Sequence, residues 1–167
     1  ANYESLIDVL HHAGLAVLWL DNQAGCKGVC ERVSEVRTTA LKDPALCPDG
    51  ECLDPIMLKD LDQRLADLPA EQRRRGTVVV LHEMGSHGPA YFKRSAPALK
   101  KFQPECTSTN LQECTQEQVV NAYDNSIVQT DQFLDSVLNW LSDQSDKAQT
   151  AMIYVADHGE SLGENNI

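Results

Sequence analysis

The chain is short of positive charge, aromatic residues and long apolar runs. It carries 14 lysine and arginine residues against 25 acidic ones, which gives a formal net charge of −11. Nucleic-acid binding needs a basic surface, and the one basic run, residues 73–75, is short. No apolar stretch approaches the ~20 residues of a membrane-spanning helix, and the first residues lack the layout of a signal peptide. We therefore expect no nucleic-acid partner and no membrane anchor within these residues.

The cysteines lie in three close couples, each inside a loop that contains Gly, Pro or Asn. The couples are Cys26 with Cys30, Cys47 with Cys52, and Cys106 with Cys114. Zinc is the rival explanation, but Cys-x3-Cys and Cys-x4-Cys spacings differ from the Cys-x2-Cys zinc knuckle, and the third couple is wider still. We predict a local disulfide within each couple, and hence an oxidising compartment such as the periplasm.

Three short apolar runs have the length of buried strands: residues 15–20, 77–82 and 151–156. Each is continuous, as in strands that are covered on both faces. A long loop, residues 21–53, follows the first run and carries four of the cysteines, and another loop, residues 83–113, follows the second.

Helical patterns alternate with these runs. Residues 2–12 read as a short helix that ends near Gly14. A second helix begins at Asp54 as N-cap, with Pro55 at its first turn, and Pro69 stops it. A capping box opens a third helix over residues 115–142, and a helical turn is expected near 96–101. Each helix has a face that is predicted to be buried. In the first helix it consists of Leu6, Ile7, Val9 and Leu10, and in the second of Leu58, Leu61, Leu65 and Leu68. In the third it consists of Val120, Tyr123, Ile127, Leu134, Val137, Leu138 and Leu141.

Alternating helices and strands predict one α/β domain with a mainly parallel sheet and right-handed crossovers. In such a sheet the carboxyl ends of all strands share one edge. The loops at that edge carry one lysine, three histidines and several carboxylates: Lys27, His82, His87, Asp157, His158 and Glu160. Carboxylate and imidazole suit a metal ion, while lysine and histidine suit an anion, so the edge suits a metal with a phosphorylated substrate.

Other interpretations of these loops are weaker. His82 and His87 are five residues apart and Gly85 lies between them, so they do not form the helical His-Glu-x-x-His pattern of zinc proteases. Residues 159–163 match the Gly-x-Ser-x-Gly nucleophile elbow, but two residues separate them from the strand and no helix start follows. Taken singly, the loop around His82 could be an ordinary loop, and Lys27 a solvated residue.

Four segments together resemble one known family. They are residues 21–30, 82–91, 121–125 and 157–165. The chain is similar to the periplasmic catalytic domain of bacterial lipid A phosphoethanolamine transferases, an alkaline-phosphatase-like family that includes transferable colistin-resistance enzymes. The resemblance runs nearly end to end.

The resemblance implies a layered α/β/α, sulfatase-like fold, with residues 1–167 forming part of a catalytic domain at the periplasmic face of the inner membrane. It implies a ping-pong reaction in which a zinc-activated threonine takes phosphoethanolamine from phosphatidylethanolamine and passes it to a lipid A phosphate. The implied zinc ligands are Asp157 and His158, with Glu160 as a polar neighbour. The implied substrate-binding residues are His87, His82 and Lys27.

The sequence also departs from the family pattern. The family's nucleophilic threonine and a further acidic zinc ligand lie upstream of the segment that matches Ala1, and another histidine lies downstream of Ile167. Since a catalytic zinc usually has about three protein ligands, we expect this chain alone to bind zinc weakly and not to turn over. The alternatives to a phosphoethanolamine transferase are a sulfatase or phosphatase of the same superfold, or a non-catalytic domain cross-linked by disulfides.

Overall fold

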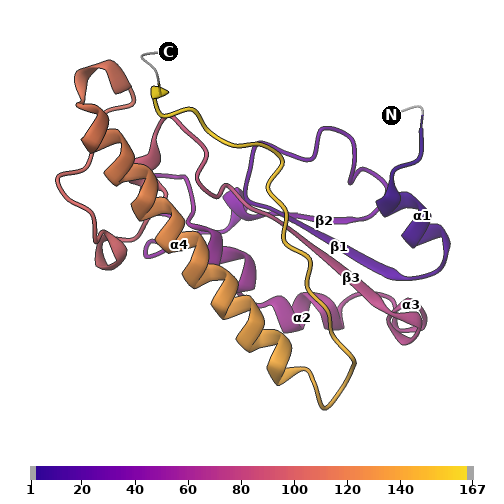
Figure 1. Cartoon of the computed structure of the whole chain (residues 1–167). Helices are drawn as coiled ribbons and strands as arrows, with labels where there is room; N and C mark the ends of the chain where they lie inside the picture. Colours follow the sequence, from indigo (N-terminus) through magenta and orange to yellow (C-terminus); the bar gives the residue numbers. More distant parts are fainter. Residues whose placement is uncertain (1–2, 165–167) are drawn as a thin grey trace. The chain divides into compact units, whose positions relative to one another are not determined.

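The computed structural model describes residues 3–164, apart from the side chain of Thr39. The chain forms two compact units that divide between Met84 and Gly85. The first unit contains a three-stranded sheet with short helices, and the second contains the long helix α4 and its loops (Figure 1). No helix in the described part of the chain has both the length and the apolar character needed to cross a bilayer.

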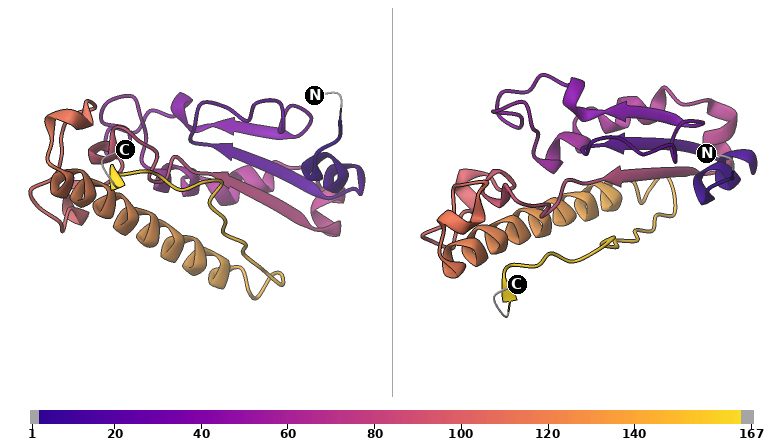
Figure 2. Two further views of the ribbon diagram at one scale, coloured as in Figure 1. Left: turned by 45° about the horizontal axis from the view of Figure 1, so that its top comes forward. Right: turned by 90° about the horizontal axis from the view of Figure 1, so that it is seen from above.

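The sheet of the first unit is parallel, as predicted. It consists of β1 (Ala16–Asp21), β2 (Ser34–Arg37) and β3 (Thr77–His82), in the order β2-β1-β3. Figure 2 shows the three arrows running in the same direction, with β1 between its neighbours. Every residue of β1 is buried, because the strand is apolar until its last residue, whereas β3 is mostly half-buried. The four-residue β2 went unpredicted because Ser-Glu-Val-Arg has no apolar run to mark it.

The first helix, α1 (Leu6–His12), begins at a capping box formed by Ser5 and Asp8. Its expected apolar face is wrong in part. Leu6 is 71% exposed and Val9 49%, and Ile7 is the residue that packs against the cluster around Trp19. The buried side chain of this helix is instead Asp8, which accepts hydrogen bonds from Arg32.

The predicted helix from Asp54 to Leu68 is divided in two. A 3-10 segment, η2 (Asp54–Leu58), is followed by α2 (Leu61–Ala66), and between them Asp60 adopts a left-handed conformation with φ of 55°. An α-helix cannot continue through that conformation. Asp54 is therefore not an N-cap but lies buried inside the 3-10 turn. A third short helix, α3 (Ala70–Arg75), leads into β3.

The second unit is built on α4 (Gln116–Asp143), whose capping box between Thr115 and Gln118 is confirmed. Three 3-10 turns precede it: η3 (Tyr91–Lys93), η4 (Pro97–Leu99) and η5 (Leu111–Glu113). The first two pack against α4, and η4 confirms the expected turn near 96–101. Tyr91 and Cys106 join Val119 and Ala122 in one apolar cluster.

The buried face of α4 differs from the predicted one. Ile127 is 44% exposed and Leu138 52% exposed, and of the predicted face only Val137 is buried. The residues that are buried include several polar ones: Val119, Ala122, Asn125, Ser126, Gln129, Thr130, Phe133 and Val137. The prediction was wrong because it ranked positions by apolar character, whereas polar side chains with hydrogen-bond partners are buried as well.

The predicted strand over residues 151–156 is also wrong in the described structure. This segment is extended but is assigned to no strand (Figure 1). Ile153 is 93% exposed and Val155 80%. A strand is defined by its backbone ladder with a neighbour, and an apolar run supplies the side chains for burial but not the neighbour.

All three predicted disulfides are confirmed. They join Cys26 to Cys30, Cys47 to Cys52 and Cys106 to Cys114. The first two lie in the first unit and the third in the second. Each closes a short loop, which limits the conformations that the loop can reach before folding.

Candidate functional site

The carboxyl end of the sheet holds a close pair of side chains. Asp21 and His82 are the last residues of β1 and β3 and lie opposite each other in the parallel ladder. The His82 Nδ1 atom lies 2.6 Å from Asp21 Oδ1. Asp21 is 1% exposed, whereas the His82 side chain is 34% exposed. The imidazole therefore lies between a buried carboxylate and solvent.

Asp21 also anchors the loop that carries Lys27. Its second oxygen, Oδ2, accepts a hydrogen bond of 2.8 Å from the backbone N–H of Gly25. The disulfide between Cys26 and Cys30 then closes the turn, and Lys27 lies exposed at its tip with a left-handed φ of 48°. A single carboxylate thus contacts both His82 and the loop of Lys27.

A second buried network lies beside this pair. Asn22 donates to Asp54 Oδ1 at 2.7 Å and accepts a hydrogen bond of 2.5 Å from the Thr38 hydroxyl. The same Asp54 oxygen accepts from the backbone N–H of Met84 at 2.8 Å. Sequence reasoning missed this network because Asp54 has the pattern of a helix cap. The network ties the loop after β3 to the loops after β1 and β2.

Glu83 follows His82 directly, and its carboxyl group is partly buried, where the ionised form is poorly solvated. Burial, followed by the nearby charge of Asp54, raises the pKa of Glu83 to about 8. The group therefore holds its proton at neutral pH, since the desolvated carboxylate would be destabilised.

In the second unit, His87, His158 and Glu160 lie together. The rings of His87 and His158 are edge-on, with centroids 6.2 Å apart. Glu160 accepts a hydrogen bond from the Gly88 N–H at 3.2 Å and another from the Tyr91 hydroxyl at 3.4 Å. Burial, and then the charge of Glu160, raises the pKa of Tyr91 to about 12, so the hydroxyl remains a donor. These contacts join the loop after Gly85 to the segment after residue 156.

Asp157 and His158 are themselves exposed. Their side chains are 88% and 56% exposed, and His158 Nε2 lies 3.8 Å from Asp157 Oδ2. The Nδ1 atom of His158 contacts the Gly159 carbonyl at 2.8 Å. This hydrogen bond, and then the charge of Asp157, raises the pKa of His158.

The three predicted histidines share one arrangement of the ring. In each, Nδ1 contacts an oxygen of the protein: Asp21 Oδ1 for His82, the Gly88 carbonyl for His87 and the Gly159 carbonyl for His158. A carbonyl or carboxylate oxygen is only an acceptor, so Nδ1 carries the hydrogen and Nε2 is left for a ligand. Metal-binding histidines are commonly oriented in this way.

The structure thus groups the predicted site residues in two sets. His82 and the loop of Lys27 share Asp21 in the first unit, and His87, His158 and Glu160 lie together in the second. The expected meeting of both sets at one sheet edge stays a prediction.

The donor types at residues 157 and 158 suit zinc, which takes carboxylate oxygen and imidazole nitrogen. These two residues would supply two ligands. Within residues 3–164, one group of three candidate ligands lies close together, formed by Cys26, Cys30 and Glu35. Both of its sulfur atoms are oxidised in a disulfide and cannot act as thiolates.

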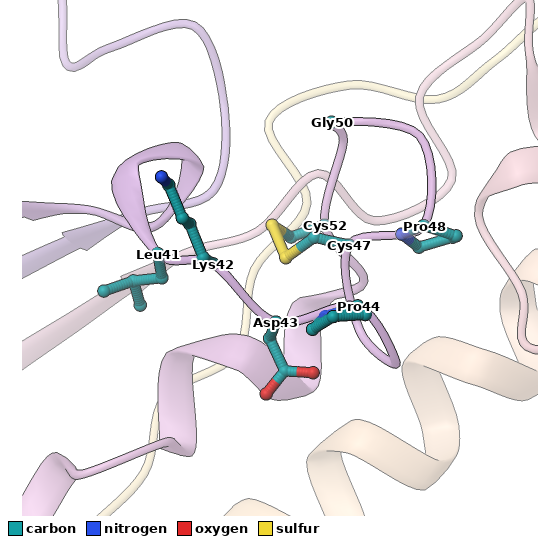
Figure 3. Close-up of a pocket in the computed structure, with 8 residues that line it drawn as sticks. All are labelled: Leu41, Lys42, Asp43, Pro44, Cys47, Pro48, Gly50 and Cys52. Carbon is teal, nitrogen blue, oxygen red and sulfur yellow. A yellow bond between two sulfur atoms is a disulfide. The ribbon is translucent and has the colours of Figure 1, made fainter.

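A pocket of about 350 Å³ lies in the first unit, apart from the predicted side chains. It is formed by the loop around the Cys47–Cys52 disulfide, where Lys42 and Asp43 project in opposite directions (Figure 3). Asp43 is paired with Lys59 at 2.6 Å. None of the six residues predicted to bind metal or substrate lines this pocket.

Comparison with known proteins gives a consistent result. Residues 1–167 match the sulfatase family. Phosphoethanolamine transferase EptA of Escherichia coli strain K12 is 44% identical over 164 residues, which are 98% of this chain and 29% of that protein. Phosphatidylethanolamine transferase Mcr-1 of Escherichia coli is 38% identical over 170 residues, covering 98% of this chain and 31% of that protein. The chain therefore spans less than a third of the length of these curated relatives.

Solved structures show the same likeness. The integral membrane protein lipooligosaccharide phosphoethanolamine transferase A from Neisseria meningitidis superposes with a TM-score of 0.85 at 40% identity, covering 98% of this chain and 29% of that one. The periplasmic domain of EcEptC from Escherichia coli, solved in complex with zinc, superposes with a TM-score of 0.60. It is 19% identical and covers 84% of this chain and 39% of that one, so it shows a shared fold.

Proposed function

The chain belongs to the sulfatase family and, within it, to the phosphoethanolamine transferases, and we propose that it takes part in moving phosphoethanolamine from phosphatidylethanolamine to a lipid A phosphate. The name of the Mcr-1 relative supports the donor, and the lipooligosaccharide in the name of the Neisseria relative supports a lipid A type of acceptor. By this transfer a lipid A phosphate gains a cationic amine, and the expected consequence is resistance to polymyxins such as colistin.

The observation that carries the proposal is the common orientation of His82, His87 and His158. Each ring is fixed through Nδ1, which leaves Nε2 for a ligand. We assign His82 and His87, with the exposed cation of Lys27, to the phosphate groups of donor and acceptor. With Nδ1–H held by the protein, Nε2 donates to a phosphate oxygen when the ring is protonated, and the ammonium of Lys27 is a second charged donor. Glu160 orients the loop of His87 through its bond from the Gly88 N–H.

Asp157 and His158 are the residues that would hold zinc. Bound zinc supplies a Lewis acid that lowers the pKa of a nucleophile and neutralises charge on a phosphoryl group. The His158 ring presents Nε2 because Nδ1 is held by the Gly159 carbonyl. We assign the nucleophile to no threonine of this chain.

The proposed site functions at the periplasmic face of the inner membrane. Three disulfides in 167 residues are typical of an oxidising compartment. The Neisseria relative is an integral membrane protein, and the proposed substrates are both lipids, so the site works against a membrane surface.

The test is lipid A modification by the complete protein that contains this chain. Mass spectrometry of lipid A from expressing cells should show added phosphoethanolamine, with a matching rise in colistin resistance. His158→Ala and His87→Ala should abolish or strongly reduce both, whereas Asp49→Asn, at an exposed loop residue, should leave both unchanged.

The alternatives give different results. Release of phosphate or sulfate from simple esters without transfer to lipid would favour a phosphatase or sulfatase. Lipid A transfer that survives the double variant Asp157→Ala/His158→Ala would contradict the zinc assignment. For the chain by itself we expect weak zinc binding and no turnover, since two ligands are fewer than the three of a usual catalytic site. Tight stoichiometric zinc in metal analysis would contradict that expectation.

A further inference from the structure

Asp21 differs from the partners of the other two site histidines. His87 and His158 contact backbone carbonyls of their own loops, whereas His82 contacts a carboxylate from a neighbouring strand. That carboxylate is 1% exposed, and both of its oxygens have partners, His82 on one and the Gly25 N–H on the other. A buried carboxylate is costly to desolvate, so its place at the end of a strand calls for an explanation.

We propose that Asp21 is a positioning residue for the substrate phosphate: it holds the His82 imidazole with Nδ1 toward the protein, so that Nε2 faces the substrate. This inference rests on the proposed function, which gives His82 its phosphate-binding role. Asp21 itself does not touch substrate. It acts through His82.

The geometry of the sheet makes this arrangement rigid. Asp21 and His82 are register partners in the parallel ladder of β1 and β3, and register partners project from the same face of a sheet. The carboxylate and the imidazole are therefore brought together by backbone hydrogen bonds rather than by a flexible loop. Binding groups on strands are placed more accurately than groups on loops.

Two further contacts fix the pair. The Trp19 ring lies against His82, with centroids 5.3 Å apart and planes tilted by 58°, which restricts rotation of the imidazole. The Gly25 N–H holds Asp21 Oδ2 at 2.8 Å, which orients the carboxylate and leaves Oδ1 for His82. Both oxygens of Asp21 therefore accept hydrogen bonds. A carboxylate can provide two acceptors because it carries no donor of its own.

Asparagine at this position would keep the size of the side chain but supply one acceptor oxygen. Its amide N–H₂ could face His82 and donate to Nδ1, or face Gly25 and leave the Gly25 N–H without an acceptor. In the first case Nδ1 becomes an acceptor, so the proton of a neutral ring moves to Nε2, and a protonated ring would direct its Nδ1–H at another donor. In the second case Nδ1–H keeps an acceptor, but the turn before Lys27 loosens. Neither arrangement supplies the two acceptor oxygens of Asp21, and the first also removes the single tautomer.

The experiment uses the 167-residue chain labelled with ¹⁵N. Long-range ¹H–¹⁵N spectra report the tautomer of each histidine at a pH of about 8, where an imidazole is ordinarily neutral. We expect His82 to carry its proton on Nδ1 in the wild-type chain and to show a mixture of tautomers in Asp21→Asn. A titration with O-phosphoethanolamine at a pH of about 6, where an imidazole is ordinarily protonated and both ring nitrogens donate, should show Kd raised about tenfold or more in Asp21→Asn, the effect of one hydrogen bond to a charged group.

Two controls separate positioning from stability. Asp8 is also 1% exposed and is bonded to Arg32 in the same unit, so Asp8→Asn tests the loss of a buried carboxylate away from His82. It should lower the unfolding free energy without changing the His82 tautomer or the Kd. In a His82→Gln background, Asp21→Asn should change the Kd less than twofold, because the residue through which Asp21 acts has been removed.

The possible failures are distinct. If O-phosphoethanolamine binds the wild-type chain and Asp21→Asn leaves both Kd and tautomer unchanged, the positioning role is wrong and the proposed function stands. If Asp21→Asn changes the Kd equally in the presence and absence of His82, Asp21 does not act through His82. If O-phosphoethanolamine perturbs no resonance of Lys27 or His82 in the wild-type chain, the proposed binding role of these residues fails, and with it the substrate half of this inference.

Discussion

Gly88 lies directly against Tyr91, with no room between them for a side chain. A Cβ atom at Gly88 would lie 2.6 Å from the Tyr91 Oη atom and 2.8 Å from Cζ. The backbone N–H of Gly88 and the Tyr91 hydroxyl both donate to Glu160. The close approach therefore lets one carboxylate hold the loop of His87 and the first 3-10 turn of the second unit together.

Gly88→Ala should destabilise the chain by about 1–3 kcal/mol, the range for overpacking at a filled position. The Tyr91 ring cannot give way easily, because it is 2% exposed and packs in the cluster with Cys106 and Val119. Urea denaturation would measure the effect. Gly159→Ala is the matched control, since a Cβ there has open space around it, and equal losses in both variants would contradict the steric explanation.

Glu83 should make the stability of the chain fall as pH rises. Its folded pKa is raised to about 8 from an ordinary 4.5, so between these values the folded chain binds more protons than the unfolded chain. The unfolding free energy then decreases with pH across that window. Glu83→Gln removes this dependence and should stabilise the chain by about 2 kcal/mol at pH 8, a value reduced for partial solvent exposure.

The Glu83 effect is checked by urea denaturation of both proteins at several pH values between 5 and 8. The gain from Glu83→Gln should be small near pH 5 and largest near pH 8. Glu31→Gln, at an exposed position of the same unit, serves as the control and should show no such trend. A Glu83→Gln gain that is constant with pH would mean that the carboxyl is already ionised in the folded chain.

The fold illustrates what an amino-acid pattern can and cannot specify. β1 was predictable because its apolar run needs burial on both faces, and the disulfides were predictable because each couple lies within one short loop. The break at Asp60 was not, since a left-handed aspartate leaves no periodic signal. The polar face of α4 was missed because Asn125 and Gln129 are buried through partners far along the chain.

The site shows the same division between local and distant information. That His82 follows a strand could be read from the sequence, but its contact with Asp21 depends on the register of β1 and β3. Likewise, the loops of His87 and Glu160 are separated by more than 70 residues and are joined by a hydrogen bond from the Gly88 N–H to the Glu160 carboxylate. Residue types at strand ends identify candidates, and tertiary structure selects their partners.

The disulfide between Cys106 and Cys114 should contribute more stability than the one between Cys47 and Cys52. Cys106 is 1% exposed, belongs to the apolar cluster with Tyr91, and is joined to a cysteine eight residues away. In the second pair Cys52 is 7% exposed and Cys47 half-buried, and the two are five residues apart, so the closed loop is shorter. Replacing both members of the first pair by serine should cost about 3–4 kcal/mol, from the lost loop constraint and the burial of a hydroxyl. The second pair should cost about 2 kcal/mol. Chemical denaturation under oxidising conditions would rank them, and the reverse order would contradict this assignment of the core.

Asn125 should be the costliest single polar residue of α4 to remove. It is 0% exposed, accepts a hydrogen bond from the Phe102 N–H, and donates to the Phe102 carbonyl and to Glu105 Oε2, each at 2.9 Å. Asn125→Ala leaves these buried groups without their partner and should cost about 2–4 kcal/mol. The control is Asn139→Ala, on an exposed part of the same helix, where one hydrogen bond of 3.1 Å to Asp135 is lost. It should cost less than about 0.5 kcal/mol.

Hydrogen exchange gives a second measurement: the Phe102 amide should lose protection in Asn125→Ala and keep it in Asn139→Ala. Retained protection in Asn125→Ala would mean that the loop before α4 is held by other contacts, and that its hydrogen bonds to Asn125 follow from the fold rather than stabilise it.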